Sequence, residues 1–223
     1  MKRTLNILIV DDHPSIIEGY ISIIENFVEG YNFNFFKAND CKQGYNIIEN
    51  NITLKNQIDI ALFDISLPAY NEKNILCGTD LAMIFKKNFP NSKVVMVTMH
   101  CERMLIHKIQ EKLNPDGFLN KTDVDPPTFQ VLFDKILAGE FYRSITIENA
   151  ILNYNKERFY LDSTDLEIIN LLEKGVKTKD LPNHLGIALS AIEKRKAKIK
   201  LQILNDKGND KALIKRIKEL ELL

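Results

Sequence analysis

The segment Ile58-Asp-Ile-Ala-Leu-Phe-Asp-Ile-Ser-Leu-Pro68 is the most informative part of the chain for its fold class. Its middle, Ile60 to Phe63, is an uninterrupted apolar run of strand length, which is typical of a central strand in a parallel sheet, buried on both faces. The run ends at the carboxylate of Asp64, and Pro68 stops any continuation of regular structure. In an open α/β sheet, ligands bind beyond the carboxyl ends of the strands, so Asp64 is a candidate site residue. The alternative is a strand-end aspartate that only caps a turn.

Three further apolar runs end in polar side chains that suit the same edge of a sheet. These end residues are Asp11 and Asp12 after the first run, Thr98 after another, and Lys121 after the last. Close carboxylates repel one another unless a hard cation joins them, and an all-oxygen site that keeps water ligands suits Mg²⁺. A carboxylate beside a metal, a lysine and a hydroxyl is equipped to accept a phosphoryl group.

The order of these residues resembles the receiver domain of bacterial two-component response regulators, over roughly residues 5–140. The resemblance implies that Asp64 is the phosphoacceptor and that Thr98 and Lys121 contact the phosphoryl oxygens. It implies that Mg²⁺ is bound directly by Asp12, Asp64 and the Ser66 carbonyl, and through water by Asp11. Phe118, three residues before Lys121, lies where receivers place an aromatic ring that reorients with the threonine; the alternative is a core phenylalanine.

Three features border the predicted site. His13 follows the two acids, and we favour a loop histidine at the rim over a metal ligand. The segment from Ala69 to Gly78 exceeds the usual connection of about 2–6 residues, so we expect an insertion that serves partner recognition or is a tolerated surface loop. Met99 replaces the small residue usual in similar receivers. We expect it to obstruct in-line approach to Asp64, the alternative being that it swings into solvent.

The pattern along residues 1–140 predicts an α/β domain with a five-stranded doubly wound parallel sheet, of the flavodoxin-like receiver type. Short apolar segments alternate with segments of helical periodicity, which is the pattern of a parallel sheet covered on both faces. The helices are expected to begin near Pro14, Asp40, Thr79, Cys101 and Asp125.

After Gly139 the periodicity weakens, and residues 141–160 are predicted to be a linker with one helix. Residues 161–223 are predicted to form a small all-α domain, with helices over 161–175, 178–185, 190–204 and 211–222. A short helix, a glycine turn at Gly186 and a longer basic helix are typical of a helix-turn-helix. Five basic residues lie between positions 194 and 200, so the third helix is a candidate phosphate-facing surface. The alternative is a solvated amphipathic helix.

Residues 161–223 also resemble the DNA-binding domain of the LuxR family. The matching positions are Glu167, Gly175, Lys179-Asp-Leu181, Leu185, Ile187, Ile192 and Ile199. The resemblance implies base contacts from Glu193, Lys194 and Ala197, with phosphate contacts from the neighbouring cations Arg195, Lys198 and Lys200.

Two departures from the LuxR pattern affect this assignment. Pro182 lies where the second helix should already donate a backbone hydrogen bond. Ala188 replaces the usual hydroxyl before the third helix, and Ser190 with Glu193 can form a capping box instead. A Glu193 engaged in that cap would read no base.

Composition sets the remaining bounds. The 223 residues contain 30 Lys and Arg and 30 Asp and Glu, but residues 1–160 hold 17 against 20 and residues 161–223 hold 13 against 10. The second part is therefore +3, which suits an anion-binding domain. Cys41, Cys77 and Cys101 are odd in number and far apart, which favours reduced thiols. No stretch approaches the roughly 20 apolar residues that span a bilayer, so we expect a cytoplasmic protein without membrane contact.

The sequence therefore predicts a regulator in which phosphorylation of Asp64 controls sequence-specific DNA binding and transcription, and not an enzyme. The implied partners are a sensor histidine kinase, Mg²⁺ and double-stranded DNA bound by a homodimer. One alternative is a Mg²⁺-dependent phosphohydrolase, but Asp64-Ile-Ser66 lacks the second acid that would act as general acid–base. Another is a pseudo-receiver adaptor that binds proteins without phosphate, which the intact set of acids disfavours.

Overall fold

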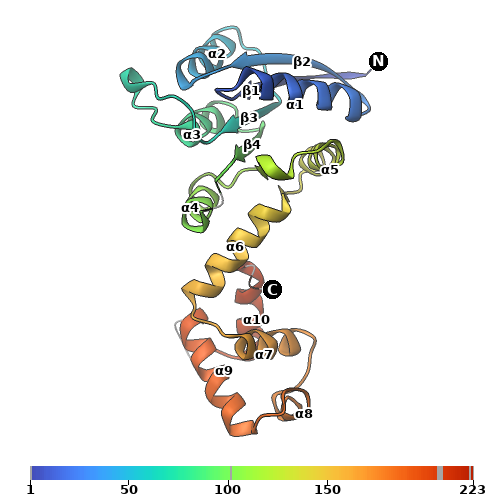
Figure 1. Cartoon of the computed structure of the whole chain (residues 1–223), viewed down its shortest axis with the longest axis vertical. Coiled ribbons are helices and arrows are strands. Elements are labelled where there is room, and N and C mark those ends of the chain that lie inside the picture. The colour runs from blue at the N-terminus through green and yellow to red at the C-terminus, as the bar shows by residue number, and fades with distance from the viewer. Residues whose placement is uncertain (1, 101, 205–207, 221, 223) are drawn as a thin grey trace. The chain divides into compact units, whose positions relative to one another are not determined.

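The chain forms two compact units, Met1–Glu148 and Asn149–Leu223 (Figure 1). The structure is a computed structural model that describes residues 2–100, 102–204, 208–220 and 222, with the backbone alone for residues 155–158. Cys101 and the helix start predicted there lie outside the described residues. Among the described residues, no helix has the length and apolar character needed to cross a membrane.

The N-terminal unit is built on a parallel sheet with strand order β2-β1-β3-β4-β5-β6. The strands are β1 (Arg3–Val10), β2 (Tyr31–Ala38), β3 (Ile60–Asp64), β4 (Lys93–Thr98), β5 (Gly117–Asn120) and β6 (Tyr142–Arg143). The doubly wound parallel sheet is confirmed, and β3 is buried at every residue as its apolar run predicts. The prediction of five strands missed β6, because a strand of two residues carries no periodicity that a sequence could show.

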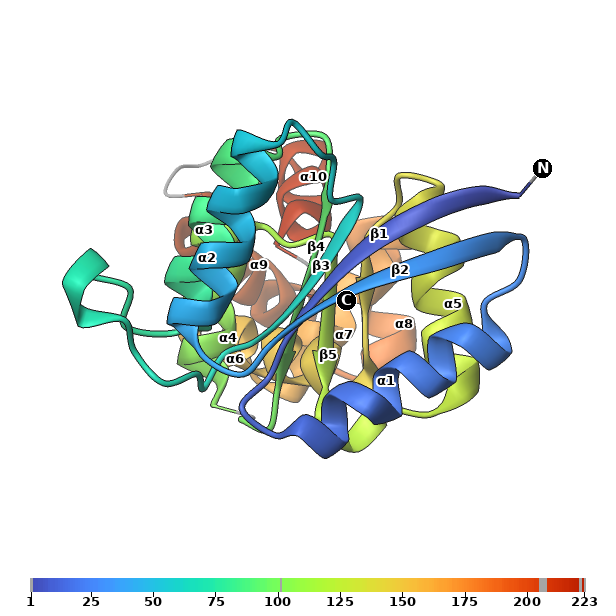
Figure 2. The same cartoon turned by 90° about the horizontal axis from the view of Figure 1, so that it is seen from above.

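Helices cover both faces of this sheet, with α1 and α5 on one face and α2, α3 and α4 on the other (Figure 2). Their bounds are α1 (Pro14–Phe27), α2 (Cys41–Thr53), α3 (Gly78–Asn88), α4 (Arg103–Leu113) and α5 (Pro126–Leu137). Asp40 and Asp125 cap α2 and α5 by accepting hydrogen bonds from the Gln43 and Thr128 amides, at 2.7 and 2.8 Å. Alternate residues of β1, such as Leu5 and Ile7, pack under α1 and α5 in the core.

The C-terminal unit is all-helical. It contains most of α6 (Ile145–Arg158), then α7 (Ser163–Glu173), the 3₁₀ turn η3 (Thr178–Asp180), α8 (Pro182–Leu185), α9 (Leu189–Leu204) and α10 (Asp210–Glu219). Ile192, Ile199 and Ile203 of α9 are buried against α7 and α10. The single helix predicted over 178–185 is wrong. It divides into η3 and α8, so that Pro182 occupies the first position of α8, where its missing N–H is not needed.

Candidate functional site

Two aspartates and a lysine meet at the carboxyl edge of the N-terminal sheet. Asp11 follows β1 and Asp64 ends β3, and these side chains are buried, with residue exposures of 1% and 4%. Lys121, which follows β5 in the 3₁₀ turn η2 (Lys121–Asp123), extends its ammonium between them. Its Nζ lies 2.7 Å from Asp11 Oδ2 and 2.8 Å from Asp64 Oδ2. Burial alone lowers the pKa of Lys121, but the bonds to both carboxylates outweigh it and raise the pKa, so the ammonium stays charged.

Asp12 and His13 extend this cluster toward solvent. His13 Nδ1 lies 2.6 Å from Asp12 Oδ1 and 3.4 Å from Asp11 Oδ1. Ligand atoms of the three residues lie within 4.8 Å of one another, which is close enough to hold a metal ion together. The His13 side chain is largely exposed, as expected of a rim histidine.

The loops that follow β3 and β4 are linked by a side-chain hydrogen bond beside the site. Ser66 donates its amide to Asp64 Oδ1 at 3.3 Å, and its hydroxyl lies 3.0 Å from His100 Nε2. The His100 amide in turn donates to the Oγ1 of the buried Thr98 at 2.8 Å. His100 was not predicted to be a site residue. The available signal was its position two residues beyond a strand end, matching Ser66 beyond Asp64.

Gly78 allows α3 to start directly against the phosphoacceptor candidate. Its amide donates to the Ile65 carbonyl at 3.0 Å, and a Cβ at this position would lie 1.7 Å from the Asp64 carbonyl oxygen. A side chain would therefore displace the backbone of Asp64. Glycine is required here by close approach of two backbones.

Phe118 and Met99 differ sharply in burial. Phe118 is fully buried on β5, beside Met96 of β4, which is the environment of a core residue in this conformation. Met99 is 60% exposed, which favours the alternative that it lies toward solvent. The switch role of Phe118 and the kinetic role of Met99 both stay predictions.

The segment Ala69–Gly78 is folded as a small hairpin. Tyr70 and Ile75 exchange backbone hydrogen bonds of 2.8 and 3.2 Å around the 3₁₀ turn η1 (Asn71–Lys73), and Ile75 is buried. The Tyr70 ring packs edge-on against Tyr45 of α2. The hairpin projects from the sheet beside α3 (Figure 2).

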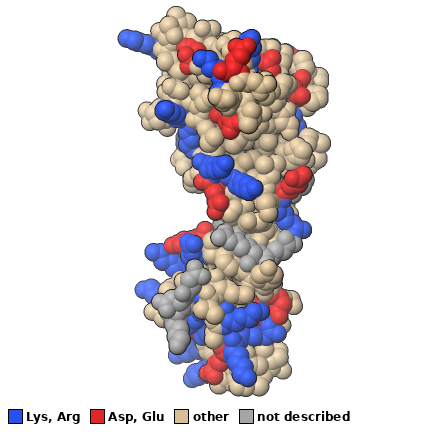
Figure 3. Space-filling view, turned by 90° about the vertical axis from the view of Figure 1, so that its left-hand side faces the viewer, with Lys and Arg blue, Asp and Glu red and all other residues tan. Residues whose placement is uncertain are grey.

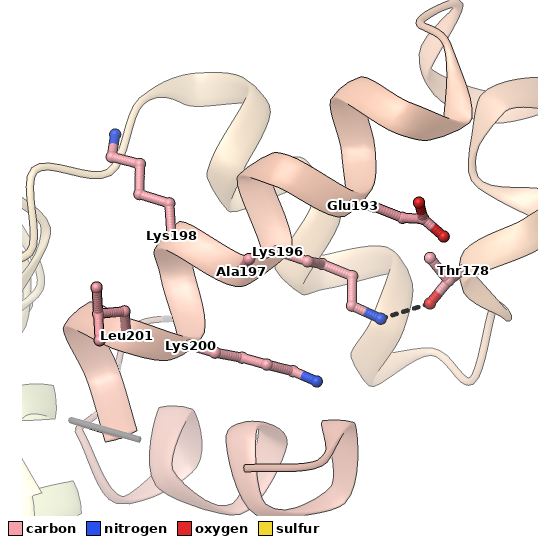
Figure 4. Close-up of a pocket in the computed structure, with 7 residues that line it drawn as sticks. All are labelled: Thr178, Glu193, Lys196, Ala197, Lys198, Lys200 and Leu201. Carbon is pink, nitrogen blue, oxygen red and sulfur yellow. Dashed lines mark hydrogen bonds between the residues drawn. The ribbon is translucent and has the colours of Figure 1, made fainter. Parts of the chain in front are cut away.

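In the C-terminal unit, one face of α9 is exposed to solvent. Its exposed members are Ser190, Glu193, Lys194, Ala197, Lys198 and Leu201. The predicted capping box of Ser190 and Glu193 is wrong, because α9 begins at Leu189 and Ser190 already lies within its first turn. Glu193 instead lines a cavity of about 720 Å³ beside η3, together with Lys196 and Lys200 (Figure 4).

Four cations of α9 form ion pairs with acids that the structure describes in the same unit, and three of them do so at short distance. Arg195 Nη1 lies 2.6 Å from Asp162 and 2.8 Å from the fully buried Asp165, which cap α7. Lys196 and Lys200 each lie 2.7 Å from the Asp210 carboxylate. The bonds from Arg195 lower the pKa of Asp162.

Lys194 and Lys198 remain exposed on the same helix. Lys198 lies 3.8 Å from Asp165, and no ion pair of Lys194 is found within the part of the chain that the structure describes. Lys and Arg side chains gather over the C-terminal unit on the face shown in Figure 3.

Comparison with known families decides the class of the chain. Residues 7–129 match the model of the response regulator receiver domain, which is more than half of the chain. The chain belongs to the response regulator receiver family. The acids, Thr98 and Lys121 at the sheet edge all lie within the matched receiver residues, whereas β6 and α6 lie beyond them.

Curated relatives match this response regulator over nearly its full length. It is 22% identical over 206 residues to the transcriptional regulatory protein MctR of Rhizobium johnstonii, covering 91% of this chain and 88% of the relative. It is 23% identical over 217 residues to the oxygen regulatory protein NreC of Staphylococcus carnosus, covering 92% and 93%.

Solved structures show the same fold. RcsB of Salmonella enterica serovar Typhimurium, bound to the promoter P1flhDC with the phosphomimetic BeF3−, is 19% identical with a TM-score of 0.56, covering 96% of this chain and 97% of that one. A LuxR-family two-component response regulator of Aurantimonas sp. is 26% identical with a TM-score of 0.55, covering 68% and 97%.

Proposed function

We propose that this response regulator accepts a phosphoryl group on Asp64 and thereby controls the binding of its C-terminal unit to double-stranded DNA. The observation that carries the first part is the Lys121 ammonium held 2.8 Å from the buried Asp64 carboxylate, at the edge of the sheet. In the proposed reaction, an Asp64 oxygen bonds to phosphorus as the donor's bond to phosphorus breaks, giving an acyl phosphate. Lys121 and the Thr98 hydroxyl are proposed to stabilise the negative charge of the phosphoryl oxygens.

The residues at this edge fit a Mg²⁺ ion. Asp11, Asp12, Asp64 and the Ser66 carbonyl would hold it, and together they supply only hard oxygen donors, which this ion prefers. Bound there, Mg²⁺ would offset the mutual repulsion of the carboxylates and the incoming phosphoryl charge. Phe118 is proposed to reorient together with Thr98 when Asp64 is modified.

The phosphodonor is proposed to be a sensor histidine kinase that acts on this chain in the cytoplasm. Support comes from the receiver family itself and from the Aurantimonas relative, which is described as a two-component response regulator. The hairpin at Ala69–Gly78 borders the site, which suits partner recognition, but an ordinary surface loop would have the same structure.

We assign DNA binding to residues 161–223, acting as a homodimer. Within them, α9 is the helix proposed to contact the DNA. We assign phosphate contacts chiefly to Lys194 and Lys198. Arg195 and Lys200 are held by acids of the same unit at 2.6–2.8 Å, whereas Lys198 lies 3.8 Å from Asp165 with half of its side chain exposed. Glu193 and Ala197 are proposed to contact base edges, since both are exposed on the same stretch of helix and Glu193 can accept a bond from a cytosine amine. The DNA-bound RcsB structure, with the same fold, supports this assignment.

The phosphoacceptor is tested by intact-mass measurement of the full chain with acetyl phosphate and Mg²⁺. We expect one added phosphoryl group in the wild type and none in Asp64→Asn. Asp59→Asn is a matched control, because Asp59 pairs with Arg3 and precedes the same strand. Full labelling of Asp64→Asn would overturn the assignment.

A further inference from the structure

The outer edge of β5 is closed by the segment that leads into α6. Tyr142 donates its amide to the Asp116 carbonyl and Ser144 donates to the Phe118 carbonyl, each at 3.0 Å. Through these bonds β6 pairs in parallel with β5 and becomes the sixth strand of the sheet. Lys121 directly follows β5. The strand that leads into this lysine is therefore hydrogen-bonded to a segment that lies outside the matched receiver residues.

Side chains of the same segment fix the backbone on both sides of Lys121. The Asn120 amide donates to the Oγ of the buried Ser144 at 3.0 Å. The Asp123 carboxylate accepts from the Thr146 amide at 3.0 Å and from the Thr146 hydroxyl at 2.8 Å. Burial raises the pKa of Asp123, but the bonds from Ser144, Thr146 and Thr122 outweigh it and lower the pKa, which is the sign expected for an ionised acceptor.

These hydrogen bonds matter because a lysine side chain does not fix its own position. Its four-carbon stem is flexible, so the position of the ammonium depends on where the backbone is anchored. Lys121 must reach Asp11 and Asp64 together, at 2.7 and 2.8 Å. The anchors at Asn120 and Asp123 lie one residue before it and two residues after it.

We propose that Ser144 and Thr146 are positioning residues for Lys121, so that the segment entering α6 completes the phosphoacceptor site. The inference rests on the proposed role of Asp64 and extends the site beyond residue 140, where the sequence placed the end of the receiver. Thr146 lies in the first turn of α6. A displacement of the start of α6 would therefore change the position of Lys121. Because coupling is reciprocal, a change in the partner of Lys121 would equally affect the start of α6.

Thr146 offers a clean test because it is partly exposed and has a near-isosteric replacement. In the full chain, Thr146→Val should slow labelling by acetyl phosphate with Mg²⁺ by about three- to tenfold, the change that one hydrogen bond corresponds to. Thr146→Ser keeps the hydroxyl and should restore the rate. Thr53→Val is the matched control, because it removes a threonine hydroxyl bond to Glu49 within α2 and should leave the rate unchanged.

A double-variant cycle separates positioning from general destabilisation. Lys121→Ala should slow labelling by itself, and adding Thr146→Val to Lys121→Ala should slow it no further. Equal slowing by Thr146→Val with and without Lys121 would overturn the inference, as would wild-type labelling of Thr146→Val. Wild-type labelling of both Lys121→Ala and Asp64→Asn would instead overturn the proposed phosphoacceptor site.

Discussion

The two units use clustered charge in opposite ways. In the N-terminal unit, Asp11, Asp64 and Lys121 come from different strands, converge at one edge and form the candidate site itself. In the C-terminal unit, cations adjacent along α9 diverge, and Arg195 and Lys200 are neutralised by α7 and α10. The position of a charged residue at the end of a strand therefore predicts where its side chain lies in the fold. A run of cations on a helix predicts the number of charges but not which of them are paired.

The largest effect among the cations of α9 is expected for Arg195→Ala. This change removes the 2.8 Å bond from Arg195 to the fully buried Asp165, which then keeps, among the described residues, only the Asp162 amide at 3.3 Å and Lys198 at 3.8 Å. We therefore expect a clear loss of hydrogen-exchange protection in α7. Lys194→Ala, one residue earlier and exposed, should stay within about 0.5 kcal/mol of the wild type. Hydrogen exchange of the α7 amides in the full chain measures both. Equal protection in the two variants would show that Arg195 is no more structural than Lys194.

For DNA binding, we expect the exposed lysines of α9 to matter more than a lysine that is paired with an acid. Lys194→Ala and Lys198→Ala should each flatten the dependence of log affinity on log salt by about one unit, because each removes a phosphate contact. Lys200→Ala is the matched control on the same helix and should leave the slope unchanged, because Lys200 is paired with Asp210. Fluorescence anisotropy with a duplex selected from a random pool provides the slopes. A flatter slope in Lys200→Ala alone would reverse the assignment.

Particular residues show what the sequence could and could not predict. Asp11, Asp64, Thr98 and Lys121 were predicted to meet because parallel strands end at a common edge. The partner of Arg195 was not predictable, because Asp165 lies 30 residues away and helical periodicity gives faces, not pairs. Ser144 and Thr146 were missed for a related reason, since β6 is too short to show a strand pattern.

The smallest expected effect concerns Met99. Met99→Ala should speed both labelling of Asp64 and decay of the acyl phosphate, because it restores the small residue that similar receivers carry after the threonine. The increase should be small, since Met99 is 60% exposed and lies toward solvent. Rates measured by intact mass for the two proteins give the answer. Identical rates would leave Met99 without a kinetic role.

In the proposed regulator, phosphorylation of Asp64 in one unit controls DNA binding by the other. The affinity of the full chain for the selected duplex, measured with and without acetyl phosphate and Mg²⁺, tests this control. We expect the phosphodonor to tighten binding by the wild type and to leave Asp64→Asn unchanged. The same tightening in Asp64→Asn, or none in a fully labelled wild type, would contradict it.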